Sequence, residues 1–478
     1  MLHASTLALA GLVSTAVAET VHGVVVFSRH GDRTTKHFGA QVLTPLGAQQ
    51  CFQVGSEYRA RYFASDSPHR INGISEFQHV AAQVWASAPD QSILLGTATS
   101  FLQGLYPPLG DIQASDVSMQ LANSSSVSNP LSGYQYVTLH GINDDSPETV
   151  WIKGDDDCPV VAAASADFKT SAEYKSRLAS TRDFYRSLYP LVHEIYLSAD
   201  NLSYAKAYDI FDVINVENLH NATSPARNVT ADQLFQLRTL ADSAEFGLNY
   251  NNSQPARSLH ARTLAASVLS HLNETVNSAG QNPKFALLAG SYDTFLAFFG
   301  LANLTAASPD FFGLPDYAST MAFELFTPGA AFDKDDLHVR YLFKNGSTGA
   351  IKSFPLFGSG KADCVGRLCQ RHAAARPEHR GGVVQRLPER GRLLRRVQQR
   401  RQVRRGCHVV CCWWWRDDSV LSRGGSIAVL VVMAVAILGN LIWAAMWLVR
   451  RKGGRRRRPL RGWERPSKRA QPSDKESV

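Results

Sequence analysis

Three residues near the N-terminus have the types and spacing that phosphoryl-transfer chemistry requires. Arg29, His30 and Arg33 lie in the segment RHGDR, directly after the apolar run 22–28. Each guanidinium can offer two parallel hydrogen bonds to phosphoryl oxygens. An imidazole held between them can attack phosphorus and form a covalent phosphoenzyme that water then hydrolyses. Gly31 would allow the backbone to approach the anion closely. The alternative is a solvated loop in which this cluster occurs by chance.

The surrounding pattern predicts an α/β fold. The run 22–28 (HGVVVFS) predicts a buried strand, and 284–289 predicts a second. Thr44 and Pro45 are typical of an N-cap and first helical residue. That helix should reach about Tyr62 with one side formed by Leu46, Phe52, Gly55, Tyr58 and Tyr62.

Helices are also expected at 92–105, 171–189, 205–213, 230–246 and 258–273, and strands at 321–326, 338–343 and 350–356. Strands at both ends with helices between them favour an α/β core that carries a helical insertion. Open α/β sheets bind ligands at the carboxyl ends of their strands. The segment RHGDR therefore follows its strand where a site is expected.

Several motifs resemble those of the histidine acid phosphatases, including the phytases, in the phosphoglycerate-mutase-like superfamily. The resemblance covers about residues 20–358 and is carried by RHGDRT (29–34), LTPLG (43–47) with Gln50, GSEYRARY (55–62), GLYPP (104–108), 289–294 and YASTMAFEL (317–325). It implies an α/β/α sandwich with a mostly helical inserted second domain. It also implies hydrolysis of phosphomonoesters at acid pH, without a metal or other cofactor.

The resemblance assigns roles to four residues. His30 is similar to the family's nucleophile, and Arg29 and Arg33 to its phosphate ligands. Asp293 matches the acidic residue that protonates the leaving alcohol, a role for which burial beside the phosphate could raise its pKa.

The chain departs from the family pattern at two places. Tyr292 stands where the family usually has a histidine, and no arginine occurs in 85–92, where Gln91 could donate a neutral hydrogen bond to substrate. Each lost charged donor can cost on the order of 10²-fold in rate. The alternative to an enzyme is therefore a catalytically impaired pseudophosphatase that acts as a phospho-ligand-binding glycoprotein at the cell surface.

The remaining acidic and histidine residues suggest no second catalytic motif. The run 155–157 (DDD) is expected to be a solvated acidic loop, with a calcium site as the alternative. The histidines outside the motif are expected at the surface or in satisfied packing positions: His69, His79, His140, His260 and His271.

The charge distribution argues against a nucleic-acid partner. The 478-residue chain has a formal charge of +9, but residues 1–360 carry −11 whereas 361–425 carry +11 and 450–478 carry +9.

Residues 1–18 resemble a secretory signal peptide, with an apolar run at 7–13 and small residues at 16–18. Eight Asn-x-Ser/Thr sequons agree with secretion and predict a glycoprotein: Asn123, Asn201, Asn221, Asn228, Asn251, Asn273, Asn303 and Asn345.

A membrane anchor is expected near the C-terminus. Residues 426–449 are uncharged and long enough, as a helix, to cross a hydrocarbon core of roughly 30 Å. Basic residues follow at once, which predicts a cytoplasmic tail at 450–478 that contacts anionic lipid headgroups. The acidic body would then be extracellular or lumenal, at the cell surface or on an endomembrane or vacuolar membrane.

The segment 361–425 differs from the rest of the chain because it is rich in arginine and cysteine. The abrupt change favours a mistranslated stretch from a wrong intron or reading frame. The alternatives are a disordered stalk, an arginine-rich arm and a metal site at Cys407, His408, Cys411 and Cys412. The predicted order is a signal peptide (1–18), the first part of the α/β phosphatase domain (19–160), a helical insertion (161–275), the second part of the α/β domain (276–360), the atypical segment (361–425), a transmembrane helix (426–449) and a tail (450–478).

Overall fold

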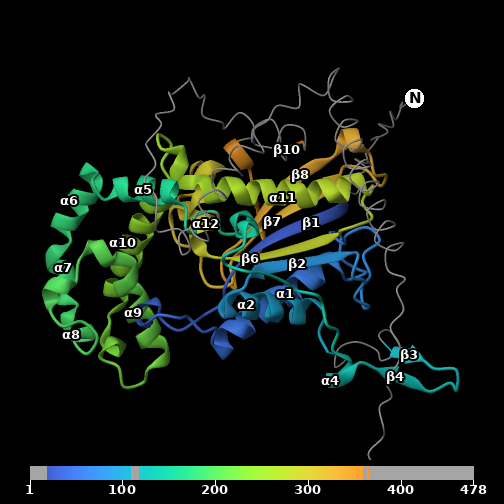
Figure 1. Ribbon diagram of the computed structural model, residues 1–478, viewed down its shortest axis with the longest axis horizontal. Coiled ribbons are helices and arrows are strands. Elements are labelled where there is room, and N and C mark those ends of the chain that lie inside the picture. The colour runs from blue at the N-terminus through green and yellow to red at the C-terminus, as the bar shows by residue number, and fades with distance from the viewer. Residues whose placement is uncertain (1–18, 109–117, 359–362, 365–478) are drawn as a thin grey trace, which may run out of the picture. The chain divides into compact units, whose positions relative to one another are not determined.

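A mixed eight-stranded sheet forms the centre of the computed structural model, which describes residues 19–108, 118–358 and 363–364 (Figure 1). The strand order is β10-β8-β7-β1-β6-β2-β5, with β9 paired to β8. Strands β1, β6, β2 and β5 are parallel, β7 is antiparallel to β1, and β8 is antiparallel to β7. The strands are β1 (Thr20–Arg29), β2 (Val84–Pro89), β5 (His140–Ile142), β6 (Phe285–Gly290), β7 (Thr320–Thr327), β8 (His338–Lys344), β9 (Lys352–Phe354) and β10 (Asp363–Cys364). The segments that follow the four parallel strands therefore lie at one edge, called here the carboxyl edge.

Helices cover both faces of the sheet because β1 buries side chains on both. Val24 and Val26 pack in one core with α1 (Pro45–Tyr62) and α2 (Ser92–Leu105). Val25 and Phe27 pack in the other with α11 (Leu259–Asn277) and α12 (Tyr292–Leu301). A strand buried on both sides has a continuous apolar sequence, as the run 22–28 does. The predicted α/β/α arrangement with a central sheet is confirmed (Figure 1).

A second group of helices has a core of its own. Tyr185, Val213 and Leu237 belong to that core. Figure 1 shows α6, α7 and α8 away from the sheet. The helices of this group are α5 (Pro159–Phe168), α6 (Ala172–Ser180), α7 (Arg182–Ser187), α8 (Tyr189–Val192), α9 (Ala207–His220) and α10 (Ala231–Asn249). Helix α11 crosses the boundary expected at 275, because its apolar side packs on β1.

Two glycines set the contact between α1 and α2. A Cβ atom on Gly55 would lie 2.0 Å from the carbonyl oxygen of Phe101, and one on Gly104 would lie 2.1 Å from that of Phe52. The two backbones therefore touch directly. Leu46 and Phe52, which were expected on the same side as Tyr58, are 39% and 38% exposed because this close crossing selects a different face.

Helix α1 begins where its sequence predicted. The Thr44 hydroxyl accepts a hydrogen bond from the Gly47 amide at 3.0 Å, and Pro45 is the first helical residue. Strand β2 was not predicted, because its buried residues Ala86, Ser87 and Ala88 are small and lack the β-branched pattern of a strand. A short hairpin, β3 (Ser118–Gln120) with β4 (Ser126–Ser128), and the four-residue α4 (Pro130–Gly133) complete the described α-helices and strands, and short 3-10 helices lie in the loops between them.

The proposed targeting segments lie outside the described residues. These are the signal peptide at 1–18, the span at 426–449, the tail at 450–478 and, apart from Asp363 and Cys364 in β10, the segment 361–425. Within the ranges that the structure describes, no helix has the length and apolar character needed to cross a membrane.

Candidate active site

The carboxyl edge of the sheet brings together the residues that the sequence singled out. Arg29 is paired in register with Gly290, so the segment after β1 lies beside the start of α12. Strands β2 and β5 end at the same edge, next to Gln91 and Asp144. All six predicted site residues are therefore at this edge: Arg29, His30, Arg33, Gln91, Tyr292 and Asp293.

His30 is a buried imidazole with a defined tautomer. Its side chain is 4% exposed, and Nδ1 lies 2.9 Å from the carbonyl oxygen of Gly31. A carbonyl oxygen can only accept, so Nδ1 carries the proton and Nε2 keeps its lone pair. Burial, followed by the positive charges of Arg29, Arg33 and Lys36, holds the pKa of His30 well below its usual 6.5. The lowered pKa favours the neutral form of the imidazole, which is the nucleophilic form.

Arg33 is held rigidly by residues of the helical group. Its NH1 donates to Asp212 of α9 at 3.0 Å and its NH2 donates to the Tyr208 hydroxyl at 3.0 Å. The side chains of Arg33 and Asp212 are 1% and 3% exposed. Burial alone would lower the pKa of Arg33, but Tyr208, Tyr317 and Asp212 raise it, so the guanidinium remains charged.

Arg29 lies between two aromatic rings. Its guanidinium carbon is 5.2 Å from the ring centroid of Tyr292 and 4.6 Å from that of Tyr317, distances typical of cation–π contacts. Its NH1 donates to the carbonyl oxygen of Pro315, and its buried Nε has no hydrogen-bond partner in the described part of the chain. Arg29 therefore keeps donor capacity for an anion.

Gly31 approaches the backbone of Gly47 closely, whereas the sequence led us to expect a close approach to the bound anion. A Cβ atom there would lie 2.3 Å from the carbonyl oxygen of Gly47, and one on Gly47 would lie 2.1 Å from that of Asp32. Gly31 is thus required where the loop packs against the first turn of α1. This contact holds the loop, and His30 with it, on a rigid helix.

Asp293 lies in the first turn of α12 beside a second carboxyl group. Its Oδ1 accepts from the Thr294 amide at 2.8 Å. Burial, and next the charge of Asp293, raise the pKa of Asp155 to about 6. Of the run 155–157, expected as a solvated loop, Asp156 and Asp157 are exposed, but Asp155 is half-buried and its Oδ1 is buried without a hydrogen-bond partner in the described ranges. No group of three or more His, Cys, Asp or Glu side chains in those ranges could hold a metal ion.

His260 supports the backbone of the same turn. It is 0% exposed, and its Nε2 donates to the carbonyl oxygen of Asp293 at 3.3 Å. A Cβ atom on Gly154 would lie 3.0 Å from the Cα atom of His260, so the loop that carries Asp155 rests on this part of α11. His260 is therefore a packing residue of the site.

Tyr292 and Gln91 both donate to carboxylates of the protein. The Tyr292 hydroxyl donates to Glu245 of α10 at 2.9 Å. Gln91 Nε2 lies 3.3 Å from both carboxylate oxygens of Asp144. Their direct binding to substrate remains a prediction.

The Glu245 carboxyl should make stability depend on pH. Its pKa is raised from 4.5 to about 7, chiefly by burial, although the Tyr292 hydrogen bond and Lys36 act in the opposite direction. The folded state then binds a proton more tightly than the unfolded chain, so stability is lost as pH rises from about 4.5 to 7. Urea titrations of wild type and of Glu245→Gln at about pH 4.5 and pH 7 measure this loss. Between these two pH values, we expect the free energy of unfolding of wild type to fall by up to about 3 kcal/mol relative to that of Glu245→Gln. Parallel pH profiles for the two proteins would contradict this assignment.

Lys36 is a site residue that the sequence analysis missed. Its Nζ lies 5.8 Å from the Tyr208 ring centroid and 5.6 Å from that of Tyr292, and its charge contributes to lowering the pKa of His30. Its position three residues after Arg33 could have identified it as a further cation of the site. Tyr208, Asp212 and Glu245 carried no such signal, because they come from helices more than 170 residues further along the chain.

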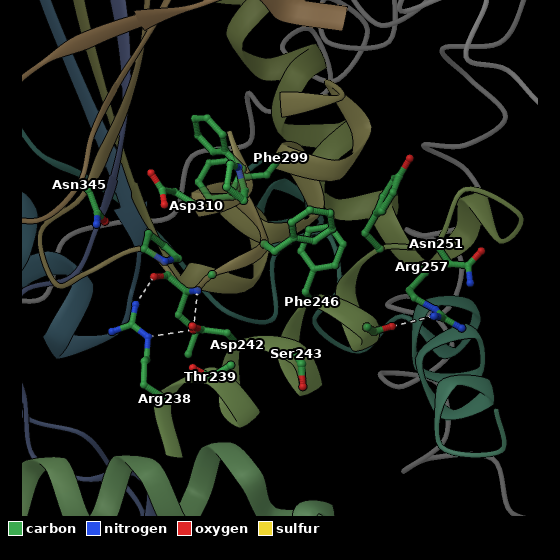
Figure 2. A pocket seen from close by; sticks show the side chains of 18 of the residues that line it. Arg238, Thr239, Asp242, Ser243, Phe246, Asn251, Arg257, Phe299, Asp310 and Asn345 are labelled. Atoms are coloured by element: carbon green, nitrogen blue, oxygen red, sulfur yellow. Dashed lines mark hydrogen bonds and ion pairs between the residues drawn. The ribbon is translucent and has the colours of Figure 1, made fainter. Parts of the chain in front are cut away.

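Two cavities lie near the carboxyl edge, and the smaller one reaches Arg29. Its volume is about 370 Å³ and Arg29, Tyr208, Asp212 and Tyr317 contribute to its wall. The larger cavity, of about 1180 Å³, is shown in Figure 2 and is lined by residues of α10, α12 and the loops beside them.

Two arginines that line the larger cavity, Arg238 and Arg257, are already hydrogen-bonded to groups of the protein. Arg238 donates to Asp242 at 2.8 Å, to Asp316 at 3.1 Å and to the carbonyl oxygen of Leu314. Arg257 donates to backbone carbonyl oxygens, including that of Gly247 at 2.7 Å (Figure 2). Neither His30 nor Asp293 lines either of these two cavities, and Arg29 is the one predicted site residue that does, in the smaller cavity.

Comparison with known proteins gives one family. The chain matches the model of the histidine phosphatase superfamily (branch 2) over residues 35–344. Comparison with curated proteins finds no match.

Three solved structures share the fold at low sequence identity. The Citrobacter braakii phytase has a TM-score of 0.50 and 12% identity, over 75% of this chain and 98% of that one. The Klebsiella sp. ASR1 phytase has a TM-score of 0.50 and 14% identity, over 78% and 100%. The Hafnia alvei phytase in complex with myo-inositol hexakis sulphate has a TM-score of 0.50 and 14% identity, over 75% and 97%. The sheet, the residues at its carboxyl edge and the family match agree: the chain belongs to branch 2 of the histidine phosphatase superfamily.

Proposed function

We propose that the chain is an acid phosphatase that hydrolyses phosphomonoesters through a phosphohistidine on His30, with Asp293 as general acid. The observation that carries the proposal is the buried imidazole of His30, whose pKa is held below its usual value. Its Nδ1 proton is bound to Gly31, and Arg29 and Arg33 lie on either side of it in the sequence.

In the first step, Nε2 of His30 attacks phosphorus and a P–N bond forms as the ester P–O bond breaks. The Asp293 carboxyl transfers its proton to the leaving alcohol oxygen. In the second step, water attacks phosphorus, the Asp293 carboxylate takes the water proton, and the P–N bond breaks. His30 recovers its Nε2 lone pair and phosphate is released.

The arginines stabilise the charge that develops on the phosphoryl oxygens. Arg33 is positioned in advance by Asp212 and Tyr208, so little reorganisation is needed when substrate binds. Arg29 has an unpartnered Nε in the described structure and is backed by the rings of Tyr292 and Tyr317.

The proposal is tested by trapping the intermediate. Enzyme is mixed with a ³²P-labelled aryl phosphate at acid pH and quenched in alkali, in which phosphohistidine is stable. We expect the label to be lost in acid and to map by mass spectrometry to the peptide that contains His30. Turnover with the label on another residue would overturn the assignment.

A pseudophosphatase is the second candidate, favoured by one observation. Tyr292 and Gln91, the neutral replacements for charged family residues, donate to Glu245 and Asp144. A folded protein that binds phosphate but shows neither label nor turnover would support this candidate.

We also propose that the protein is a glycosylated, single-pass membrane protein with its phosphatase domain outside the cytosol. The support is the sequence of 1–18, 426–449 and 450–478 together with the eight sequons. Glycosidase treatment should increase gel mobility, and protease added to sealed membrane vesicles should remove only the tail. Loss of the whole chain to protease without any glycan would contradict the topology.

A further inference from the structure

The cations at the site are enough for only one phosphoryl group. Arg29, Arg33 and Lys36 are the cationic residues whose charges act on His30. Arg33 is neutralised by its buried ion pair with Asp212 at 3.0 Å. No carboxylate in the described ranges lies within ion-pair distance of the side chains of Arg29 or Lys36. Arg29 and Lys36, which form no ion pair in the described ranges, thus supply the positive charge for a phosphomonoester, which carries one to two negative charges depending on pH.

The side of the site around Asp293 holds carboxyl groups in place of further cations. Asp155 and Asp156 lie close enough for the charge of Asp293 to act on both. Lys153 does not supply a free charge there, because it is ion-paired with Asp156. The leaving alcohol is protonated by Asp293, so this is the side that the alcohol must occupy.

The Asp293 side of the site extends along the carboxyl edge to the ends of β2 and β5. There Gln91 donates to Asp144, whose charge also acts on Asp156. A carboxyl group repels an anion when it is ionised and offers no positive charge when it is protonated. In neither state do these residues supply the positive charge that would balance a second phosphate group.

Aromatic rings flank Arg29. Tyr292 and Tyr317 flank Arg29, and Tyr208 stacks on Tyr292 with ring centroids 4.8 Å apart. These rings offer uncharged contact surface and no counter-charge for an anion.

We infer that the site selects esters with a single phosphoryl group on an alcohol that carries no further negative charge, and discriminates against polyphosphorylated substrates. This inference rests on the proposed function, because it assigns the leaving alcohol to the Asp293 side. One extra negative charge on the alcohol should lower kcat/KM at least about tenfold, the equivalent of about 1.4 kcal/mol.

The test compares glycerol 3-phosphate with glycerate 3-phosphate, which differ by one carboxylate, and with inositol hexakisphosphate. We expect kcat/KM to fall at least about tenfold from the first to the second, and further for the third. Gln91→Arg should reduce the ratio of kcat/KM between glycerol 3-phosphate and glycerate 3-phosphate severalfold, because the arginine would offset the negative charge of Asp144. The control Gln120→Arg, in the exposed strand β3, adds the same charge away from the site and should leave the ratio unchanged.

Equal values for the two three-carbon esters, or a preference for inositol hexakisphosphate, would overturn the inference. The two proposals can fail separately, because binding is measured in the inactive His30→Ala protein as well. Calorimetric titration of that protein should show tighter binding of glycerol 3-phosphate than of glycerate 3-phosphate. If turnover is absent from wild type but this binding order holds, the catalytic proposal fails and the selectivity stands.

Discussion

Replacing His30 with alanine should reduce kcat for an aryl phosphate by at least about 10⁴-fold, because the nucleophile of a covalent mechanism has no substitute. The side chain is buried beside Gly31, and no second histidine among the described residues takes its place between the two arginines. The measurement is steady-state hydrolysis between about pH 3 and 7, with circular dichroism to establish that the variant is folded.

The exposed His193 provides the matched control. It lies after α8 in the helical group and bonds only locally, to the carbonyl oxygen of Pro190 at 3.1 Å. His193→Ala should keep wild-type activity. A His30→Ala protein that retained a tenth of wild-type kcat would exclude His30 as the nucleophile.

Replacing Asp212 with asparagine should destabilise the fold by about 3–5 kcal/mol, the usual cost of leaving one partner of a buried ion pair uncompensated. Asp212 accepts hydrogen bonds from the Arg33 guanidinium, from the Thr35 hydroxyl at 2.9 Å and from the Lys36 amide at 2.8 Å. It therefore connects α9 to the loop after β1 by contacts with three residues. Urea denaturation at constant pH measures the loss.

Inorganic phosphate should recover part of this loss. A ligand that binds only the folded state stabilises it, and phosphate would supply the negative charge that Arg33 loses in Asp212→Asn. We expect phosphate to raise the melting temperature more in the variant than in wild type. An equal shift in both proteins would mean that Arg33 does not face the anion.

The control is Asp209, one turn earlier on the same helix. It pairs with His37 at 3.1 Å, but the His37 side chain is 24% exposed and the Asp209 side chain is 32% exposed. Solvent screens such a pair, so Asp209→Asn should cost no more than about 1 kcal/mol. Equal losses in the two variants would contradict the role given to the burial of Asp212.

Local features of the fold could be predicted from local sequence. The strand before RHGDR, the start of α1 at Thr44 and Pro45, and the bounds of α2 depend on apolar runs, caps and prolines that act over a few residues. Leu46 and Phe52 were placed on the wrong side of α1. Their exposure depends on the glycine contacts with α2, about 50 residues away.

The candidate site divides in the same way. Arg29, His30 and Arg33 were found because they are consecutive or nearly so and follow a buried strand. The carboxylates that bind the site residues come from the helical group: Asp212 binds Arg33 and Glu245 binds Tyr292. No sequence motif pointed to either carboxylate. Asp155 was expected in solvent, and its burial beside Asp293 depends on how the Gly154 loop packs on α11.

The sequence by itself determined the reactive residue types, the strand that precedes them and the resemblance to one phosphatase family, because these depend on neighbours along the chain. Only the tertiary structure decided which charges surround them. It neutralised Arg33 with Asp212, left Arg29 and Lys36 without carboxylate partners in the described ranges, and placed carboxyl groups around Asp293. Electrostatic interactions act through space, so the charge balance of the site exists only once distant segments are packed together.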